Sequence, residues 1–490
     1  MVAVRASERH SGSGVSAGHC RSRSLRLTAV LFMLLPAAAA GQPGAPQSTT
    51  TGHVDAAPSD ARVQIEELRA EIAAERQRIA QLELTLQESR AALERLSARI
   101  GAASNEAPAP VSVAAQTTSP PSPERPRFDF YADTLIRLAT LHQDYDGCVG
   151  CPDRTIGRFR MRFGAEGRMA PGVRAIFGLS AGELNDPNSV YQTFGSNISR
   201  KVATWDRAYL IVRPTRAPWL ELQVGKFPYP WLRSSMTFDV DFYPEGASER
   251  VSFDVTHAGP LRNVSAQGFQ VVVNEQASAP DMVLVGGQAI SAWKLGALST
   301  RVALTAVDIR RPELILRSQL DGSDVGVKNT NAIIVDASGA RYASGFRYAN
   351  LIVDGALQTR WPAFPITGAV ELHRNTRAIS DRNSAESIRV DVGRQQKGGD
   401  WAFGWHTFRV EQDAIVSAMG ESDWRTPSNV LQHRLGVIYT MQEHFQALFT
   451  LYRGRTLDSR LPGAVLIPGW TPGLTEPYAN RFYFDLNYRF

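Results

Sequence analysis

The chain has 490 residues, of which 43% are hydrophobic and 21% charged, and its formal net charge is +5. Beyond the first 40 residues no segment is apolar enough to be a membrane-spanning helix, which excludes a helical membrane protein. We expect no nucleic-acid partner.

The amino-terminal residues 1–40 predict a secretory signal peptide. Arginines precede the apolar run 27–35, and Pro36 and four alanines ending at Ala40 follow it. A charged region, a short apolar core and a small-residue cleavage site, in this order, are typical of exported proteins. We therefore expect export, with cleavage after Ala40.

Residues 41–126 predict three segments that lie before any globular domain. Residues 41–61 are small and polar, which favours disorder. Over 62–100, apolar residues recur every seven positions from Ile65 to Ile100, with leucines at the matching second position, which predicts an α-helical coiled coil. So thin an apolar stripe needs partner helices; a single helix packed on a domain is the weaker alternative. Six prolines make 101–126 an extended linker.

Cysteine is scarce, and the exported chain would keep only Cys148 and Cys151 in "DGCVGCPD". In an exported protein, a C-x-x-C pair between Gly and Pro favours a small disulfide that pins a loop. A zinc site would need two more ligands nearby, which the sequence does not offer, so no metal or other cofactor is expected.

Residues 127–490 show a period of two instead of the helical period. Phe159, Met161 and Phe163 alternate with Arg158, Arg160 and Arg162, for example, so one face is apolar and the other charged. The segments are about 9 to 13 residues long, the length that a tilted strand needs to cross a membrane. Tight turns alternate with long polar loops at 184–202, 309–343, 412–430 and 455–477. This pattern predicts an all-β fold, a transmembrane antiparallel β-barrel, rather than a soluble sandwich.

The strand count follows from parity. A first scan gives about 15 strands, whereas bacterial single-chain barrels have an even number, and "RVSFDVTH" supplies the missing one. The 16 predicted strands are 128–142, 155–168, 173–183, 203–213, 219–227, 250–257, 263–273, 282–293, 297–308, 344–360, 366–374, 386–395, 400–411, 431–441, 444–454 and 478–490.

The last ten residues, "RFYFDLNYRF", form the strand that must pair with the first to remove the free edge. Their apolar alternate residues are expected to face lipid, and Arg481, Asp485 and Arg489 to face the lumen. A strand that ends on Phe490 with alternating aromatics also resembles the signal that the barrel-assembly machinery reads in outer-membrane proteins.

Two stretches resemble a family of bacterial outer-membrane porins that often carry an amino-terminal coiled coil. They are "VGKFPYPWLRSSMTFDVDFYPEGA" at 224–247 and "GGDWAFGWHTFRVEQDAIVSAMGESDW" at 398–424. The matching residues are Gly225, Lys226, Phe227, Pro228, Pro230, Asp239, Asp241, Glu245, Gly246, Gly399, Asp400, Trp401, Glu411, Asp413, Ala414, Ser422 and Asp423. Phe242 and Tyr243 depart from the more polar loop of the family. The resemblance implies a homotrimeric channel in the outer membrane, with the coiled coil in the periplasm.

The leading functional hypothesis is a porin for passive diffusion of small hydrophilic solutes or ions. The expected pore-lining residues are Arg158, Arg160, Arg162, Asp129 and Asp133, and the expected constriction loop carries Asp239, Asp241 and Glu245. If that third loop folds into the lumen, its acids face the arginines and create a transverse field. The alternatives are that the acids solvate an exposed loop and that the arginines pair with Asp129 and Asp133.

Two other functions remain open at the level of sequence. The coiled coil and linker could tether the outer membrane to peptidoglycan, with the barrel as an anchor in the outer-membrane lipids. An enzyme barrel, such as a lipase or protease, would need a nucleophile and base near the rim, and the sequence shows no convincing set. We therefore expect no enzymatic activity.

Overall fold

A computed structural model describes residues 128–142, 153–182, 188–195, 198, 200–256, 259–320, 329–337 and 339–490. The chain divides into two units, Met1–Thr118 and Ser119–Phe490, and every described residue belongs to the second. The predicted signal peptide, coiled coil and linker, and the Cys148–Cys151 disulfide, lie outside the described residues and stay predictions.

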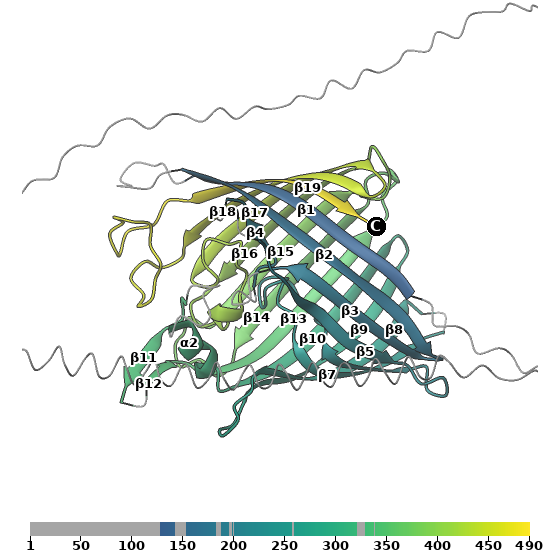
Figure 1. The fold of residues 1–490 in the computed structure, drawn as a ribbon, viewed down its shortest axis with the longest axis horizontal. Helices are drawn as coiled ribbons and strands as arrows, with labels where there is room; N and C mark the ends of the chain where they lie inside the picture. The colour runs from purple at the N-terminus through teal and green to yellow at the C-terminus, as the bar shows by residue number, and fades with distance from the viewer. Residues whose placement is uncertain are drawn as a thin grey trace, which may run out of the picture. The chain divides into compact units, whose positions relative to one another are not determined.

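The second unit is built from strands joined in chain order (Figure 1). The barrel strands are β1 (Phe128–His142), β2 (Arg154–Ala170), β3 (Val173–Ala181), β5 (Ala203–Val212), β6 (Leu220–Lys226), β7 (Glu245–Asp254), β8 (Leu261–Asn274), β9 (Met282–Leu295), β10 (Leu298–Arg310), β13 (Phe346–Leu357), β14 (Ile366–Asn375), β15 (Ser384–Gly393), β16 (Trp401–Val410), β17 (Val430–Gln442), β18 (Phe445–Thr456) and β19 (Ala479–Arg489). These 16 strands agree with the predicted count.

The sheet closes into an antiparallel barrel because β1 pairs with β19 as well as with β2. The closing register places Ile136 opposite Leu486 and Arg137 opposite Asp485. The terminal Phe490 joins this seam through two backbone hydrogen bonds of 3.1 Å with Ala132. Closure pairs every barrel strand on both sides, so no free edge remains among them, as the alternation in the last ten residues predicts.

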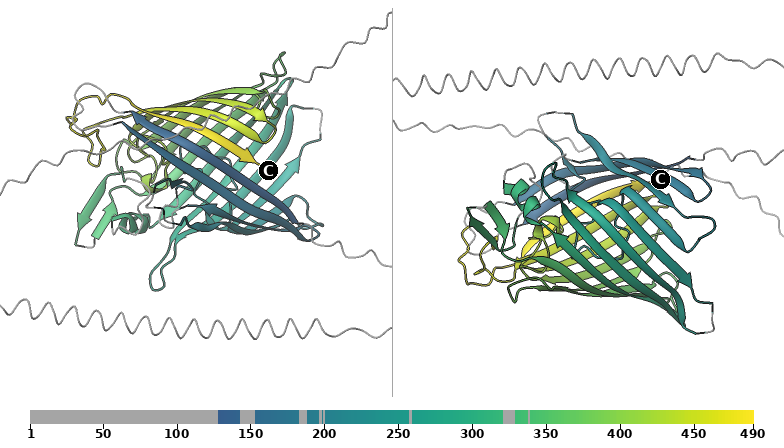
Figure 2. Two further views of the ribbon diagram at one scale, coloured as in Figure 1. Left: turned by 45° about the horizontal axis from the view of Figure 1, so that its top comes forward. Right: turned by 90° about the horizontal axis from the view of Figure 1, so that it is seen from below.

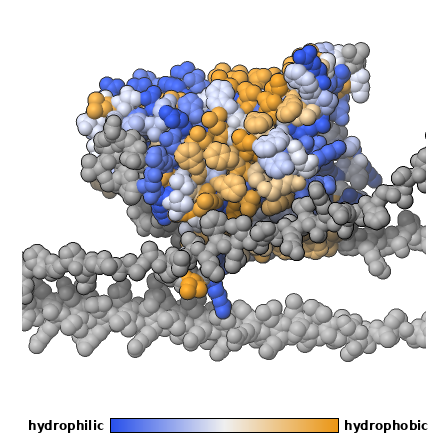
Figure 3. All heavy atoms as spheres, turned by 90° about the horizontal axis from the view of Figure 1, so that it is seen from above, coloured by the Kyte–Doolittle hydropathy of each residue, from blue (hydrophilic) through white to orange (hydrophobic). Residues whose placement is uncertain are grey.

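The alternation along each strand separates an outer apolar face from an inner polar one. On β1, Ile136 and Leu138 are 44% and 51% exposed, whereas the intervening Arg137 is 7% exposed. Phe163 on β2 and Phe484 on β19 lie outside in the same way. Figure 3 shows the result on one face, an apolar band between two polar ends. A face of this kind suits lipid, while the interior keeps the charges.

The predicted strand boundaries agree with the observed ones to within a few residues, except for β7. This strand was expected at 250–257 but spans Glu245–Asp254. Glu, Gly and Ser are weak strand formers, so the segment gave little local signal. Its pairing with β8 over the whole length, and with β6 from Glu245 to Val251, overrides that propensity.

The connections at one end of the barrel are tight, and those at the other end are mostly long (Figures 1 and 2). The long loop 311–345 contains a short helix, α2 (Glu313–Leu320), and a separate hairpin of β11 (Ile333–Asp336) and β12 (Gly339–Tyr342). The connection between β3 and β5 contains the two-residue strand β4 (Gln192–Thr193), which pairs with β2. In the part of the chain that the structure describes, no helix has the length and apolarity needed to cross a membrane.

The hydrophobic core lies inside the barrel, between its wall and two loops that fold inward. We call residues 227–244 the third loop and residues 411–429 the seventh loop. Trp231 of the third loop stacks on inward-facing Phe269 with ring centroids 3.9 Å apart, and Phe238 lies 5.9 Å from the ring of Tyr348. Most residues of the seventh loop are buried, including the run Ala414–Met419. Both loops are therefore packed parts of the barrel interior.

Candidate functional site

The third and seventh loops are joined to each other through Asp239. The backbone N–H groups of Asp241 and Ser422 each donate to the Asp239 carboxylate at 2.8 Å, and the Asp239 N–H donates to the carbonyl oxygen of Met419 at 2.8 Å. Asp239 is fully buried. Asp239 therefore links the two loops, because its side chain and its backbone both form hydrogen bonds with backbone groups of the seventh loop.

Side-chain amides and one imidazole bind the seventh loop to the loop 311–345 and to the end of β14. Asn331 Nδ2 donates to the carbonyl oxygens of Gln412 and Ile415 at 2.6 and 2.8 Å, and Asn375 Nδ2 donates to that of Asp413 at 2.8 Å. His373 Nε2 lies 2.9 Å from the carbonyl oxygen of Ala414. These buried contacts satisfy backbone carbonyl groups of the loop that have no partner in a sheet or helix, and they hold the loop in one position.

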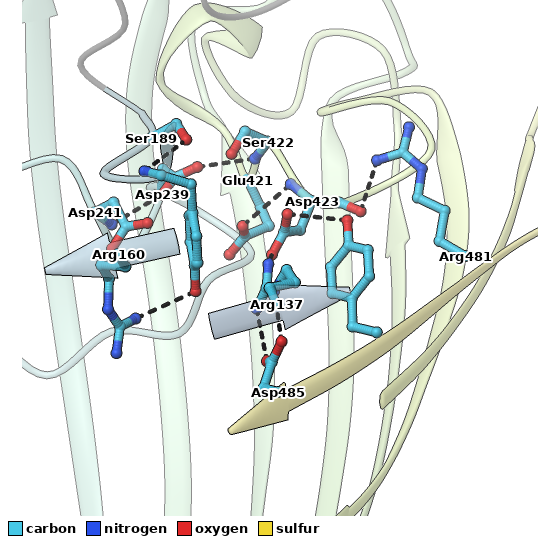
Figure 4. A network of polar contacts seen from close by, with 12 residues as sticks. Arg137, Arg160, Ser189, Asp239, Asp241, Glu421, Ser422, Asp423, Arg481 and Asp485 are labelled. Atoms are coloured by element: carbon cyan, nitrogen blue, oxygen red, sulfur yellow. Dashed lines mark hydrogen bonds and ion pairs between the residues drawn. The ribbon is translucent and has the colours of Figure 1, made fainter. Parts of the chain in front are cut away.

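Acidic residues of both loops meet arginines of the wall strands β1, β2 and β19, forming what we call the arginine–acid cluster (Figure 4). It comprises Arg137, Arg158, Arg160, Arg162 and Arg481 from β1, β2 and β19, the wall acids Asp133, Asp206 and Asp485, and the loop acids Asp239, Asp241, Glu421 and Asp423. Basic wall and acidic loops thus face each other inside the barrel.

Arg137 lies at the centre of this cluster. Its guanidinium donates to both oxygens of Asp485, at 2.9 and 3.0 Å, and to Asp423 at 3.2 Å. The rings of Tyr191 and Tyr483 lie 4.3 and 4.2 Å from its central carbon. Two carboxylates and two aromatic rings therefore compensate for the burial of this charge.

The sequence left open whether Arg158, Arg160 and Arg162 pair with acids of the neighbouring strand or face acids of the third loop, and the structure shows both arrangements. Arg160 forms an ion pair of 2.6 Å with Asp133 on the neighbouring strand. Arg162 instead reaches Asp241 of the third loop at 3.0 Å, and also Asp206 at 3.2 Å. Both the neighbouring strand and the inward third loop thus neutralise part of the ladder.

Arg158 differs from the other two arginines, because no ion pair is recorded for it among the described residues. It lies 5.6 Å from the ring of Tyr191 and faces Arg137 across the β1–β2 ladder. Like charges opposite each other on one face repel. Asp423 lies close enough to both arginines for each to favour its ionised form, so this loop acid offsets the repulsion.

The acids of the two loops differ in how readily they ionise. Burial, with the nearby Asp241 carboxylate, raises the pKa of Asp239 to about 7. Burial and the Asp239 carboxylate also raise the pKa of Glu421 well above its usual value. Burial opposes ionisation of Asp423 too, but Arg137 and Arg481 outweigh it and hold the pKa of this carboxyl below its ordinary range. Near neutral pH the cluster therefore keeps Asp423 charged while Asp239 titrates.

Two predicted site residues lie apart from this cluster. Glu245 was expected in the third loop, but it is the first residue of β7, where its exposed side chain pairs with Lys226 at 2.9 Å. The prediction was wrong because the strand begins earlier than its weak propensity indicated. Asp129 lies on the same strand face as Asp133 but nearer the start of β1, opposite Glu166 of β2.

The seventh loop contributes two acids to the cluster, Glu421 and Asp423, that were not among the predicted site residues. Glu421 and Asp423 lie in "GESDW", within a stretch recognised only for its resemblance to the porin family. The loop 412–430 was predicted as a polar loop, but its apolar run Ala414–Met419 is a local signal of burial that could have indicated its position. Among the described residues, no group of three or more His, Cys, Asp and Glu side chains could hold a metal ion.

Comparisons with known proteins give one match in sequence and several in fold. Residues 150–309 match the model of a family described as "Putative porin". No match was found among curated proteins. The fold is similar to that of Pseudomonas putida OprB, with a TM-score of 0.47 and 9% identity, covering 74% of this chain and 94% of that one.

Two further solved structures are similar in fold. One is an anion-selective porin from Comamonas acidovorans, with a TM-score of 0.43 and 12% identity, covering 75% of this chain and 100% of that one. The other is the trimer form of OmpT, an outer-membrane protein of Vibrio cholerae, with a TM-score of 0.42 and 10% identity, covering 74% and 99%. Because the family match spans the motif at 224–247, it confirms over residues 150–309 the resemblance to the porin family.

Proposed function

We propose that the chain forms a water-filled channel in the bacterial outer membrane for passive diffusion of small hydrophilic solutes or ions. The closed barrel and the porin-family match indicate an outer-membrane channel. The single observation that carries the finer proposal is the arginine–acid cluster. Two loops reach into the barrel and hold carboxylates against arginines of the wall, the arrangement that narrows and polarises a diffusion pore.

The cluster supports a channel of weak charge preference. Arg160 and Arg162 are each paired, and Arg137 lies between two carboxylates, so their fields largely cancel. Arg158 leaves a positive contribution, which the ionised fraction of Asp239 opposes. Ions passing beside the cluster would meet opposite charges on two sides, which orients polar solutes without excluding either sign.

Planar lipid bilayers provide the direct test of a channel. The purified full chain should give large, steady, stepwise currents, and the reversal potential across a salt gradient should report a small permeability ratio. A protein that inserts but never conducts would contradict the proposal. It would instead favour the structural anchor, in which the coiled coil predicted at 62–100 tethers the membrane to peptidoglycan.

We further propose that the chain forms a homotrimer. The barrels determine the number of chains, and the periplasmic coiled coil adopts the same number of helices. Ile and Leu at the repeating positions of 62–100 favour a dimer in model coiled coils, but tethering to barrels in a membrane raises the local concentration of the helices and can overrule a modest preference. Mass measurement in detergent tests this by comparing the full chain with a variant that lacks 41–126. Three chains in both are expected, and a dimer of the full chain would refute the proposal.

A further inference from the structure

The outer surface of the barrel carries a cluster of arginines on β10, β13 and the loop after β14. Arg310, Arg347 and Arg377 all reach the Asp308 carboxylate, at 3.3, 3.2 and 3.0 Å. The exposed fractions of these arginine side chains are 61%, 49% and 45%. One carboxylate cannot balance three guanidinium groups, so the patch keeps a net positive charge.

A fourth arginine extends this patch towards the apolar band. Arg374 on β14 is exposed and lies between the buried, inward-facing His373 and Asn375, so it is on the outer face. It stands opposite Ala349 of β13, one outward-facing position below Arg347. The outward faces of β10, β13 and β14, all of whose residues are described, carry no carboxylate except Asp308, and the adjacent strand β15 adds Glu386 opposite Leu372. Four arginines therefore meet two strand carboxylates. We call Arg310, Arg347, Arg374 and Arg377 the outer arginine patch.

Directly beside the outer arginine patch, the same strands form a hollow of about 660 Å³. Its outward-facing lining includes Gly287, Leu304, Ala306, Ala349, Leu372 and Arg374. The register sets Gly287, Ala306 and Ala349 in one row across β9, β10 and β13. Because this row has almost no side-chain volume, the surface is depressed there.

The hollow opens outward rather than into the lumen. Leu304 and Leu372 on its lining are 59% and 49% exposed, whereas the alternate residues Thr305 and His373 are 8% and 4% exposed. The row Asp308–Arg347 lies two residues further along the strands than Ala306–Ala349, a step of about 7 Å. An apolar depression thus adjoins a positive patch, in the direction of the long loops.

We propose that this surface binds one phosphorylated, acylated lipid of the outer leaflet, with its phosphate on the outer arginine patch and an acyl chain in the hollow. Guanidinium groups bind phosphate with paired hydrogen bonds, and an acyl chain gains by covering the depression. The volume is also in the range of sites for small ligands, about 300–1,000 Å³. The orientation, long loops outward, rests on the proposed outer-membrane channel.

The test measures lipid retention by the full chain with native mass spectrometry in a neutral detergent. The probes are lipid A carrying its phosphates, the same lipid without phosphates, and inorganic phosphate alone. Of the three probes, only phosphorylated lipid A is expected to bind, at one molecule per chain. Equal binding of the dephosphorylated lipid would overturn the role of the arginines, and equal binding of free phosphate would overturn the role of the hollow.

Variants separate the two halves of the site. The triple variant Arg347→Ser, Arg374→Ser, Arg377→Ser should raise the Kd for phosphorylated lipid A at least tenfold. A matched control, Arg216→Ser, Arg262→Ser, Arg360→Ser, removes the same charge from exposed arginines at the short-turn end and should leave the Kd unchanged. Equal effects of both triple variants would overturn the proposal, because attraction would then come from net charge alone.

Filling the hollow with Ala306→Trp should also weaken lipid binding at least tenfold while leaving the arginines in place. If this variant instead lost its oligomeric state in lipid-free detergent, a second copy of the chain would occupy the hollow and the proposal would fail. Conductance in bilayers without lipid A should be that of the wild type in the variant of Arg347, Arg374 and Arg377, because Arg347 and Arg374 lie on the outer face of the barrel. A chain that binds the lipid but does not conduct would refute the channel and leave this inference standing.

Discussion

Replacing Arg137 with Met should release the seventh loop from the barrel wall. Arg137 is 7% exposed and is held by three hydrogen bonds to Asp485 and Asp423. The substitution keeps much of the side-chain length but leaves both carboxylates without their main counter-charge. Breaking a buried ion pair from one side costs about 3 to 5 kcal/mol. Even the lower value would make undocking of the loop about a hundredfold more frequent, since ~1.4 kcal/mol corresponds to a factor of ten.

Single-channel recording measures this effect through the frequency of current fluctuations, and denaturant unfolding measures the lost stability. The control is Arg301→Met, because Arg301 pairs with Asp354 but its side chain is 50% exposed, so about 1 kcal/mol or less should be lost. Adding Asp485→Asn to Arg137→Met should restore part of the stability by removing an uncompensated charge. Quiet currents in Arg137→Met, with stability no lower than that of the control, would refute the idea that this arginine docks the loop.

Three further outcomes are expected. Because the pKa of Asp239 is raised to about 7, this carboxyl is protonated below that pH and ionised above it. The reversal potential should therefore shift towards cation selectivity between pH 6 and 8, and Asp239→Asn should abolish this shift. A shift that persists in the variant would contradict the assignment to Asp239. Replacing Arg158, Arg160 and Arg162 together with Ser should shift the reversal potential towards cations at constant pH, and no shift would mean that neighbouring carboxylates fully neutralise the ladder. Deleting Phe490, a residue that is 60% exposed, should lower the amount of folded barrel in the outer membrane without changing single-channel conductance. Assembly at the wild-type level would refute the signal in the last strand.

The barrel itself could be predicted from the sequence because the pattern that specifies it, the alternation of apolar and polar residues, lies within each strand. Each strand alternates between an apolar and a polar side chain, and a barrel between lipid and water requires that period in every strand. The parity of the strands then recovered the segment "RVSFDVTH" that a simple scan had missed. The lumenal position expected for Asp485 follows from the same alternation, and Asp485 is 3% exposed on the inner face of β19.

The position of the loops was decided by the tertiary structure alone. The seventh loop has polar residues on both sides of the apolar run Ala414–Met419. It is buried because most of this run packs into the core, and because Asn331 of another loop and Asn375 at the end of β14 satisfy its backbone. Likewise, the partner of Arg137 lies 348 residues away in Asp485, and the third loop meets the seventh through Asp239 and Ser422. The sequence by itself therefore determined which residues face inward, since alternation is a property of each strand. Which inward charges meet depended on barrel closure and loop packing, since those contacts join segments that are hundreds of residues apart.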